Sequence, residues 1–274
     1  SSHVVVNGGS LDSFSGSGTT YTAVITPSSS IVRINVSANR FTDAVGNLNT
    51  ALTQFVMFSD TTAPASQKTQ GVVTTGGDNQ VAGYWNSGNT GVDITVQIAD
   101  DSSINGGTVQ LLVSTDGGGS FVPLDTPSTI SAVNTNKTIS VASGVLEGVA
   151  GFGESDVLQF KATITDTSGN ATTGTVSDTT LTVDQTAATI STSSIASDNA
   201  TVTLAKTGDT VTLTIATNEN VSSPTVTFTS GGAAATNADT VSGASPGTSF
   251  TSAYTVDASD TDGTVAISIT ATDV

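Results

Sequence analysis

The sequence predicts an all-β protein built from tandem β-sandwich domains. Short runs in which apolar and polar residues alternate are separated by clusters of Gly, Pro, Ser and Asn, as in strands that are joined by turns. A six-residue pattern recurs along the chain, which indicates repeated domains. No window has the apolar period of an amphipathic helix.

The composition supports ordered strands and excludes several kinds of function. Of the 274 residues, 36% are hydrophobic and only 11% are charged, whereas disordered chains combine low hydrophobicity with high charge density. The net charge of -17 repels phosphate backbones and anionic lipids, so we expect no nucleic-acid partner. The absence of cysteine rules out disulfides, thiolate metal sites and thiol catalysis. No apolar run is long enough for membrane insertion.

The recurring pattern is T-D-x-x-G-N, and it sets the predicted domain boundaries. Complete copies occupy residues 42–47 and 165–170, and a third copy begins at Thr272. Each complete copy is followed by D-x-T-A, at residues 60–63 and 184–187. The nearly equal spacing predicts domains over residues 1–60, 61–184 and 185–274.

The predicted strands follow these three segments in order. In the first segment we expect strands at 20–26, 31–37 and 55–58, about five strands in all. The middle segment predicts strands at 92–98, 108–113, 137–141, 158–164 and 179–183, and the third at 202–204, 209–215, 224–228, 252–256 and 265–270. A sandwich needs roughly seven strands. We therefore expect a complete, larger middle domain, a first domain that lacks its opening strands and a third that lacks its last.

These motifs resemble the bacterial Ig-like repeats of large cell-surface adhesins and other cell-envelope proteins. In such repeats the penultimate strand ends in T-D-x-x-G-N and the next domain opens with D-x-T-A-P; here Ala188 replaces the second proline. The segment 83–91 looks like part of a larger variant of the repeat. The resemblance implies tandem Ig-like sandwiches, an extracellular location on the cell surface, and calcium bound at the domain junctions.

Acidic and amide side chains near the predicted junctions are the candidate calcium ligands. Calcium takes six to eight oxygen ligands from carboxylates, amides and carbonyls. We expect one site from Asp43, Asn47 and Asp60, and another from Asp166, Asn170 and Asp184. The alternative is that Asp, Gly and Asn form turns and bind no metal.

Two further turn-like motifs favour structural roles. The acidic run 257–263 begins like a calcium loop but lacks the later acidic residue of an EF-hand, so we interpret it as a solvated hairpin turn. The stretch 114–121 has the spacing of an Asp-box, a hairpin signature of sialidase propellers. A single copy argues against a propeller, so we expect a structural hairpin.

Binding and catalytic sites have little support in the sequence. Tyr84 and Trp85, next to amide side chains, could stack on a sugar ring, although such a pair is more often packed in a core. His3 is the only histidine, and no glutamate lies in an aromatic-rich setting that would raise its pKa. We expect the protein not to be an enzyme.

The sequence therefore predicts an extracellular structural protein, a calcium-stiffened rod that forms the stalk of an adhesin or a unit of a surface layer or filament. Its partners would be neighbouring domains, other subunits, surface glycans or cell-surface proteins. The alternative is a glycan- or protein-binding module that uses the middle domain's loops at 86–91 and 142–153. A third interpretation is an accessory part of a secreted polysaccharide-degrading enzyme.

Overall fold

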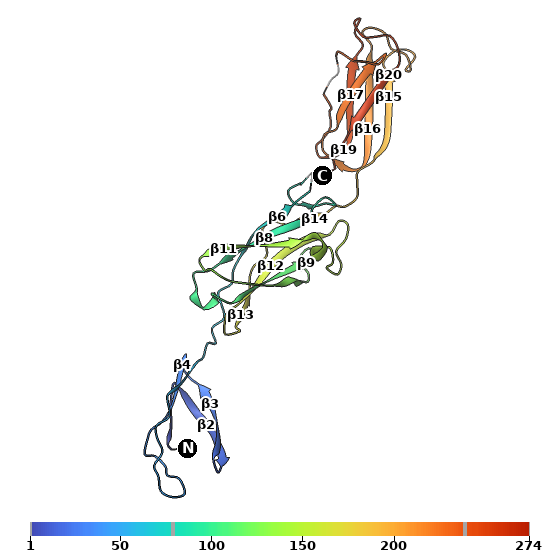
Figure 1. The fold of residues 1–274 in the computed structure, drawn as a ribbon. Coiled ribbons are helices and arrows are strands. Elements are labelled where there is room, and N and C mark those ends of the chain that lie inside the picture. The colour runs from blue at the N-terminus through green and yellow to red at the C-terminus, as the bar shows by residue number, and fades with distance from the viewer. Residues whose placement is uncertain (1, 78–79, 238–239, 274) are drawn as a thin grey trace.

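A computed structural model of the chain describes residues 2–77, 80–237 and 240–273. Within these ranges the protein has twenty strands and two very short helices, η1 (Ser102–Ile104) and α1 (Ser143–Leu146). The strands form three groups that follow one another along an extended molecule (Figure 1). No described helix is long and apolar enough to cross a membrane. The prediction of an all-β protein with several successive sandwiches is confirmed.

The first unit, residues 1–60, has two small antiparallel sheets and almost no core. Its strands are β1 (Val4–Asn7), β2 (Gly9–Ser17), β3 (Thr20–Pro27), β4 (Ile31–Val36) and β5 (Phe55–Phe58). One sheet has the order β1-β4-β5 and the other pairs β2 with β3. Among residues 2–60, Val32 is the one large hydrophobic residue that is buried, so the two sheets enclose little apolar volume.

The middle unit, residues 61–184, is the largest sandwich. Its strands are β6 (Thr69–Thr75), β7 (Tyr84–Trp85), β8 (Gly91–Ile98), β9 (Thr108–Ser114), β10 (Val122–Thr129), β11 (Thr135–Ala142), β12 (Val157–Thr165), β13 (Ala171–Thr173) and β14 (Leu181–Val183). A sheet of order β10-β9-β12-β14-β7, with β13 on β12, faces the sheet β11-β8-β6. Strands β8, β9 and β12 alternate buried and less buried residues, and their inward side chains form one core with Trp85 at 0% exposure.

The third unit, residues 185–274, is a smaller sandwich. Its strands are β15 (Ile190–Ser197), β16 (Thr210–Val221), β17 (Thr225–Ser230), β18 (Ala233–Ala234), β19 (Gly247–Thr255) and β20 (Val265–Thr270). The sheets β15-β16-β19 and β18-β17-β20 enclose a core around Phe228, Phe250 and Tyr254. The domain boundaries at residues 60 and 184 stay a prediction. The three units nevertheless describe the fold, because each sheet lies within one unit.

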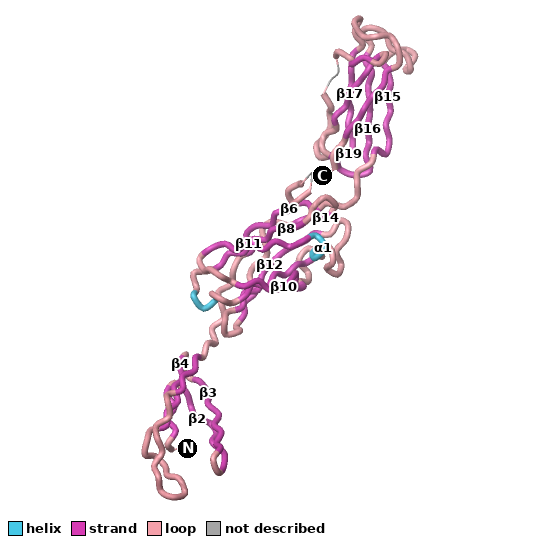
Figure 2. Tube along the Cα trace, in the orientation of Figure 1, coloured by secondary structure: helices cyan, strands magenta, loops and turns pink. Residues whose placement is uncertain are grey.

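The loops gather at the two ends of each unit, and the units follow one another end to end (Figure 2). Loops of successive units therefore lie next to each other. This arrangement follows from antiparallel pairing, which brings successive strands back and forth along the same axis. The ends of the sandwiches are therefore where side chains from two units can meet.

Candidate metal site at the second junction

The T-D-x-x-G-N motif forms a turn that satisfies its own aspartate. Asp43 Oδ1 accepts hydrogen bonds from the backbone N–H groups of Val45 (3.0 Å) and Asn47 (2.9 Å), and its Oδ2 accepts one from Asn47 Nδ2 (2.8 Å). The Asn47 side-chain amide is the largest cause that lowers the pKa of the Asp43 carboxyl. Gly46 has φ 92°, a left-handed conformation that favours glycine. The turn interpretation thus accounts for the Asp, Gly and Asn of this motif.

The structure does not bring Asp43 and Asn47 together with Asp60. Ile31 pairs with Phe58, so Asp60 lies at the end of the hairpin where β4 begins. The loop that contains Asp43 leaves from Val36, at the opposite end of β4. Six residues of strand separate these ends by about 17–20 Å, whereas every ligand must lie within ~2.6 Å of a calcium ion.

The second copy of the motif is similarly distant from Asp184. Leu158 pairs with Leu181 near the start of β12, whereas Asp166 follows the last residue of that nine-residue strand. Asn170 Nδ2 instead donates a hydrogen bond to the backbone oxygen of Asp60, at 3.2 Å. The second motif turn therefore contacts the linker that precedes its own unit, and not the linker that follows it.

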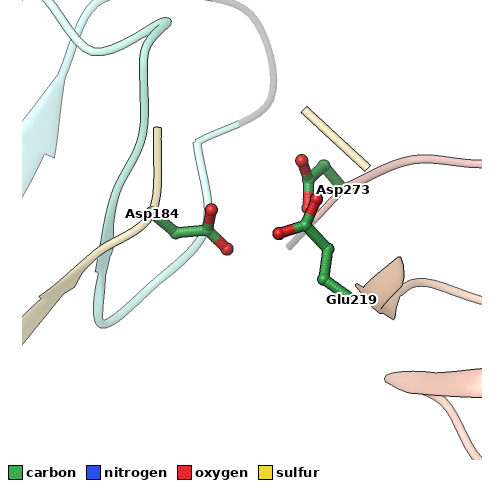
Figure 3. Close-up of side chains that lie close together, drawn as sticks. All are labelled: Asp184, Glu219 and Asp273. Atoms are coloured by element: carbon green, nitrogen blue, oxygen red, sulfur yellow. The ribbon is translucent and has the colours of Figure 1, made fainter. Parts of the chain in front are cut away.

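The third copy of the motif also lies next to the linker that precedes its unit. Its Asp273 completes a carboxylate cluster at the second junction. Asp184 follows β14 of the middle unit, Glu219 lies near the end of β16, and Asp273 follows β20. Carboxylate oxygens of these three residues lie within 4.8 Å of one another. Figure 3 shows the Asp184 side chain directed toward the other two, which approach from the third unit. We call these three residues the junction cluster.

The junction cluster carries electrostatic strain. Burial, followed by the nearby carboxylates of Asp273, Glu154 and Glu219, raises the pKa of Asp184 to about 6. Asp184 Oδ1 is buried and accepts no hydrogen bond. In contrast, Asp273 Oδ2 accepts a hydrogen bond from the backbone N–H of Ala188 at 2.8 Å. The three carboxylates thus bring negative charge to a partly buried site, and one carboxylate oxygen there, Asp184 Oδ1, accepts no hydrogen bond.

The junction cluster is a group of carboxylates that could hold a metal ion. The donor set consists of carboxylate oxygens, which calcium prefers. Buried polar oxygens are usually paired, and a divalent cation beside Asp184 Oδ1 would be one such partner. Asp43, Asn47, Asp60, Asp166 and Asn170 lie outside this cluster.

From the sequence, we placed Asp184 among the candidate ligands but included neither Glu219 nor Asp273. Asp273 carried a signal, because it is the aspartate of the third motif copy. No sequence motif marks Glu219, since only its position near the end of β16 brings it to the junction.

A hydrogen-bonded clamp holds the first residue after Asp184. Gln185 Nε2 donates to Glu147 Oε1 (2.9 Å), and the Gln185 backbone N–H donates to Glu154 Oε2 (2.9 Å). Trp85 Nε1 donates to the same Glu147 oxygen at 3.1 Å. The Trp85 ring is 0% exposed and Tyr84 is partly buried. Of the two roles considered for this pair, Trp85 takes the more frequent one: it packs in the core, and it contacts the residue that holds the linker.

The match to a known family agrees with the sandwich fold of the first unit. Residues 1–60 match the model of a family described as a bacterial Ig-like domain. A solved structure of the FN1–FN3 domains of chicken CNTN1 is 12% identical, with a TM-score of 0.32, and the alignment covers 89% of this chain and 69% of that one. No curated protein is similar enough in sequence to count as a relative.

Proposed function

We propose that the chain is an extracellular structural rod whose second junction is stiffened by calcium. In this proposal the units are spacers in the stalk of a surface adhesin, or in a subunit of a surface layer or filament. The succession of sandwiches in an extended molecule (Figure 1) supports a spacer, and so does the match of residues 1–60 to a bacterial Ig-like domain. The role is mechanical and involves no catalysis.

One observation carries the calcium part of the proposal: the junction cluster takes carboxylates from two units. Asp184 belongs to the middle unit, whereas Glu219 and Asp273 belong to the third. Without a cation their mutual repulsion favours separation of the units. A calcium ion held by Asp184, Glu219 and Asp273 would neutralise this repulsion and connect the two sandwiches.

The alternative, a glycan- or protein-binding module, has weaker support. It relies on the middle unit's loops at 86–91 and 142–153, but Glu147, in the second of these loops, is engaged by Trp85 and Gln185. One side chain of these loops therefore stabilises the linker. We rank this function second.

Small-angle scattering of the full chain during a calcium titration tests the proposal. We expect calcium to reduce the spread of overall dimensions among the molecules in solution, and a chelator to restore it. The double variant Asp184→Asn with Glu219→Gln should abolish this response to calcium. Asp43→Asn is the control, because it removes a carboxylate charge outside the cluster but keeps the turn's acceptor oxygen. A calcium response that persists in the double variant would overturn the assignment.

A further inference from the structure

The end of the third unit that lies farthest from the second junction contains an open cavity. It has a volume of about 550 Å³ and lies between the loop after β15 and the loop before β20, which are at the free end of this unit in Figure 1. Its floor includes Ser197, Val211 and Tyr254, which are 8% exposed or less. A volume of this size accommodates a small organic molecule.

An unsatisfied polar group lies in this floor. Tyr254 is 0% exposed, and its hydroxyl has no hydrogen-bond partner although it is buried. The ring packs against Phe228 with a centroid separation of 5.2 Å, so it is fixed in place. Buried hydroxyls are nearly always paired, and a polar group in the cavity would pair this one.

The rim of the cavity is acidic. Asp257, Asp260 and Asp262 line it, together with Lys206. The positive charge of Lys206 is partly engaged by Asp209, whose carboxylate it influences. The remaining negative charge attracts cations and repels anions.

Both rim loops are held in place by hydrogen bonds. In the loop before β20, Ser230 Oγ donates to the backbone oxygen of Thr261 (2.9 Å). In the loop after β15, Asn199 Nδ2 donates to Asp209 Oδ2 (2.7 Å). The cavity is therefore preformed, as most small-molecule sites are.

The middle unit shows that an open end is not inherent to these sandwiches. The loop between its first two long strands, β6 and β8, inserts Trp85, and Leu146 closes the same core; both side chains are 0% exposed. In the third unit the corresponding loop leaves Val202 59% and Leu204 63% exposed at the cavity. A ligand with an apolar body would cover these side chains.

We infer that this cavity binds a small organic ammonium ion with a short aliphatic body. The apolar walls would take the aliphatic part, the Asp262 carboxylate would attract the ammonium group, and Tyr254 would offer its hydroxyl. Anions are disfavoured by the rim.

Binding of hexylammonium to the full chain, followed by NMR, tests this inference. We expect saturable shifts of backbone amides confined to residues 195–211 and 254–265. Hexan-1-ol, which has the same body without the charge, should bind several-fold more weakly, and hexanoate should not bind. The preference for the ammonium ion should decrease with added salt.

Three variants separate this site from non-specific attraction. Asp262→Asn should reduce hexylammonium affinity several-fold and leave hexan-1-ol unaffected, whereas Tyr254→Phe should weaken both while the fold is kept. Asp125→Asn, an exposed carboxylate of the middle unit, is the control and should change neither. Equal binding of the three probes, shifts spread over all units, or no saturable binding would overturn the inference.

Discussion

At the scale of single residues, Asp184 makes the second junction sensitive to pH when calcium is removed. Its pKa is raised to about 6 from an ordinary value of 3.8. A carboxyl with a raised pKa takes up its proton in the folded state first, so stability increases as the pH falls from about 7 through 6 toward 4. Thermal unfolding in chelator should show this increase, and Asp184→Asn should reduce it. A carboxyl titration midpoint near 4 for Asp184, measured by NMR, would contradict the prediction.

Glu147 is the residue on which the linker clamp depends. Replacing it with alanine leaves the buried Trp85 N–H without an acceptor and releases Gln185. We expect the middle unit to lose about 1–3 kcal/mol of unfolding free energy. Trp85 is the only tryptophan, so its fluorescence reports the change directly. Glu154→Ala, which removes a bond to the Gln185 backbone but none to Trp85, should leave the fluorescence unchanged. A shift of equal size in both variants would speak against the clamp.

At the scale of elements, strand alternation predicted strands that bury one face, edge strands such as β20 included, and missed one that buries almost none. Strands β8, β9 and β12 alternate in burial and were predicted within one or two residues. β15 was missed, because it pairs only with β16 and nearly all its residues are exposed, so no apolar period is required. The predicted strand at 202–204 is a loop instead, with Val202 and Leu204 at the cavity.

The candidate site could be predicted only in part, because strand direction is not visible in a motif. The spacing of Asp43 to Asp60 suggested one site, yet an antiparallel hairpin places them at opposite ends. Asp184 could be identified from the repeat. Its partner Glu219 depends on the register shift near the end of β16, where pairing with β19 skips from Ala216 to Val221, and no short pattern encodes such a shift.

The two complete motif turns provide a matched pair for measuring what the motif contributes. Asp166 is 4% exposed, and its turn also connects to Asp60 through Asn170; Asp43 makes the same bonds within its turn but is exposed. Asp166→Ala should destabilise the middle unit by roughly 1–3 kcal/mol, because buried donors lose their acceptor. Denaturant unfolding followed by Trp85 fluorescence measures this. Asp43→Ala should leave that transition unchanged, and equal effects would refute the role of burial.

At the scale of the whole molecule, the three units differ in how much core supports them. Twenty buried hydrophobic residues form the middle core and seven form the third, whereas Val32 alone is buried in residues 2–60. The best-supported unit therefore lies in the centre and holds the linker clamp. Rigidity along the molecule depends on the junctions, and these differ in chemistry.

The first junction is connected by a neutral hydrogen bond from Asn170 to Asp60, and the second contains the junction cluster. We therefore expect calcium to stiffen only the second junction. Because the chain has no cysteine, spin labels react only with cysteines that are introduced. The pair Asn136→Cys with Ser193→Cys spans the second junction, and the pair Thr20→Cys with Asn136→Cys spans the first.

The distances between the two spin labels are measured by pulsed electron paramagnetic resonance. On addition of calcium, the distance distribution should narrow for the label pair that spans the second junction and stay unchanged for the pair that spans the first. Adding Asp184→Asn should remove the narrowing, because the buried carboxylate oxygen that lacks a donor is then absent. Narrowing across both junctions would mean that calcium acts through sites outside the cluster. Narrowing across neither would mean that the clamp of Glu147, Glu154 and Gln185 alone sets the stiffness of the second junction.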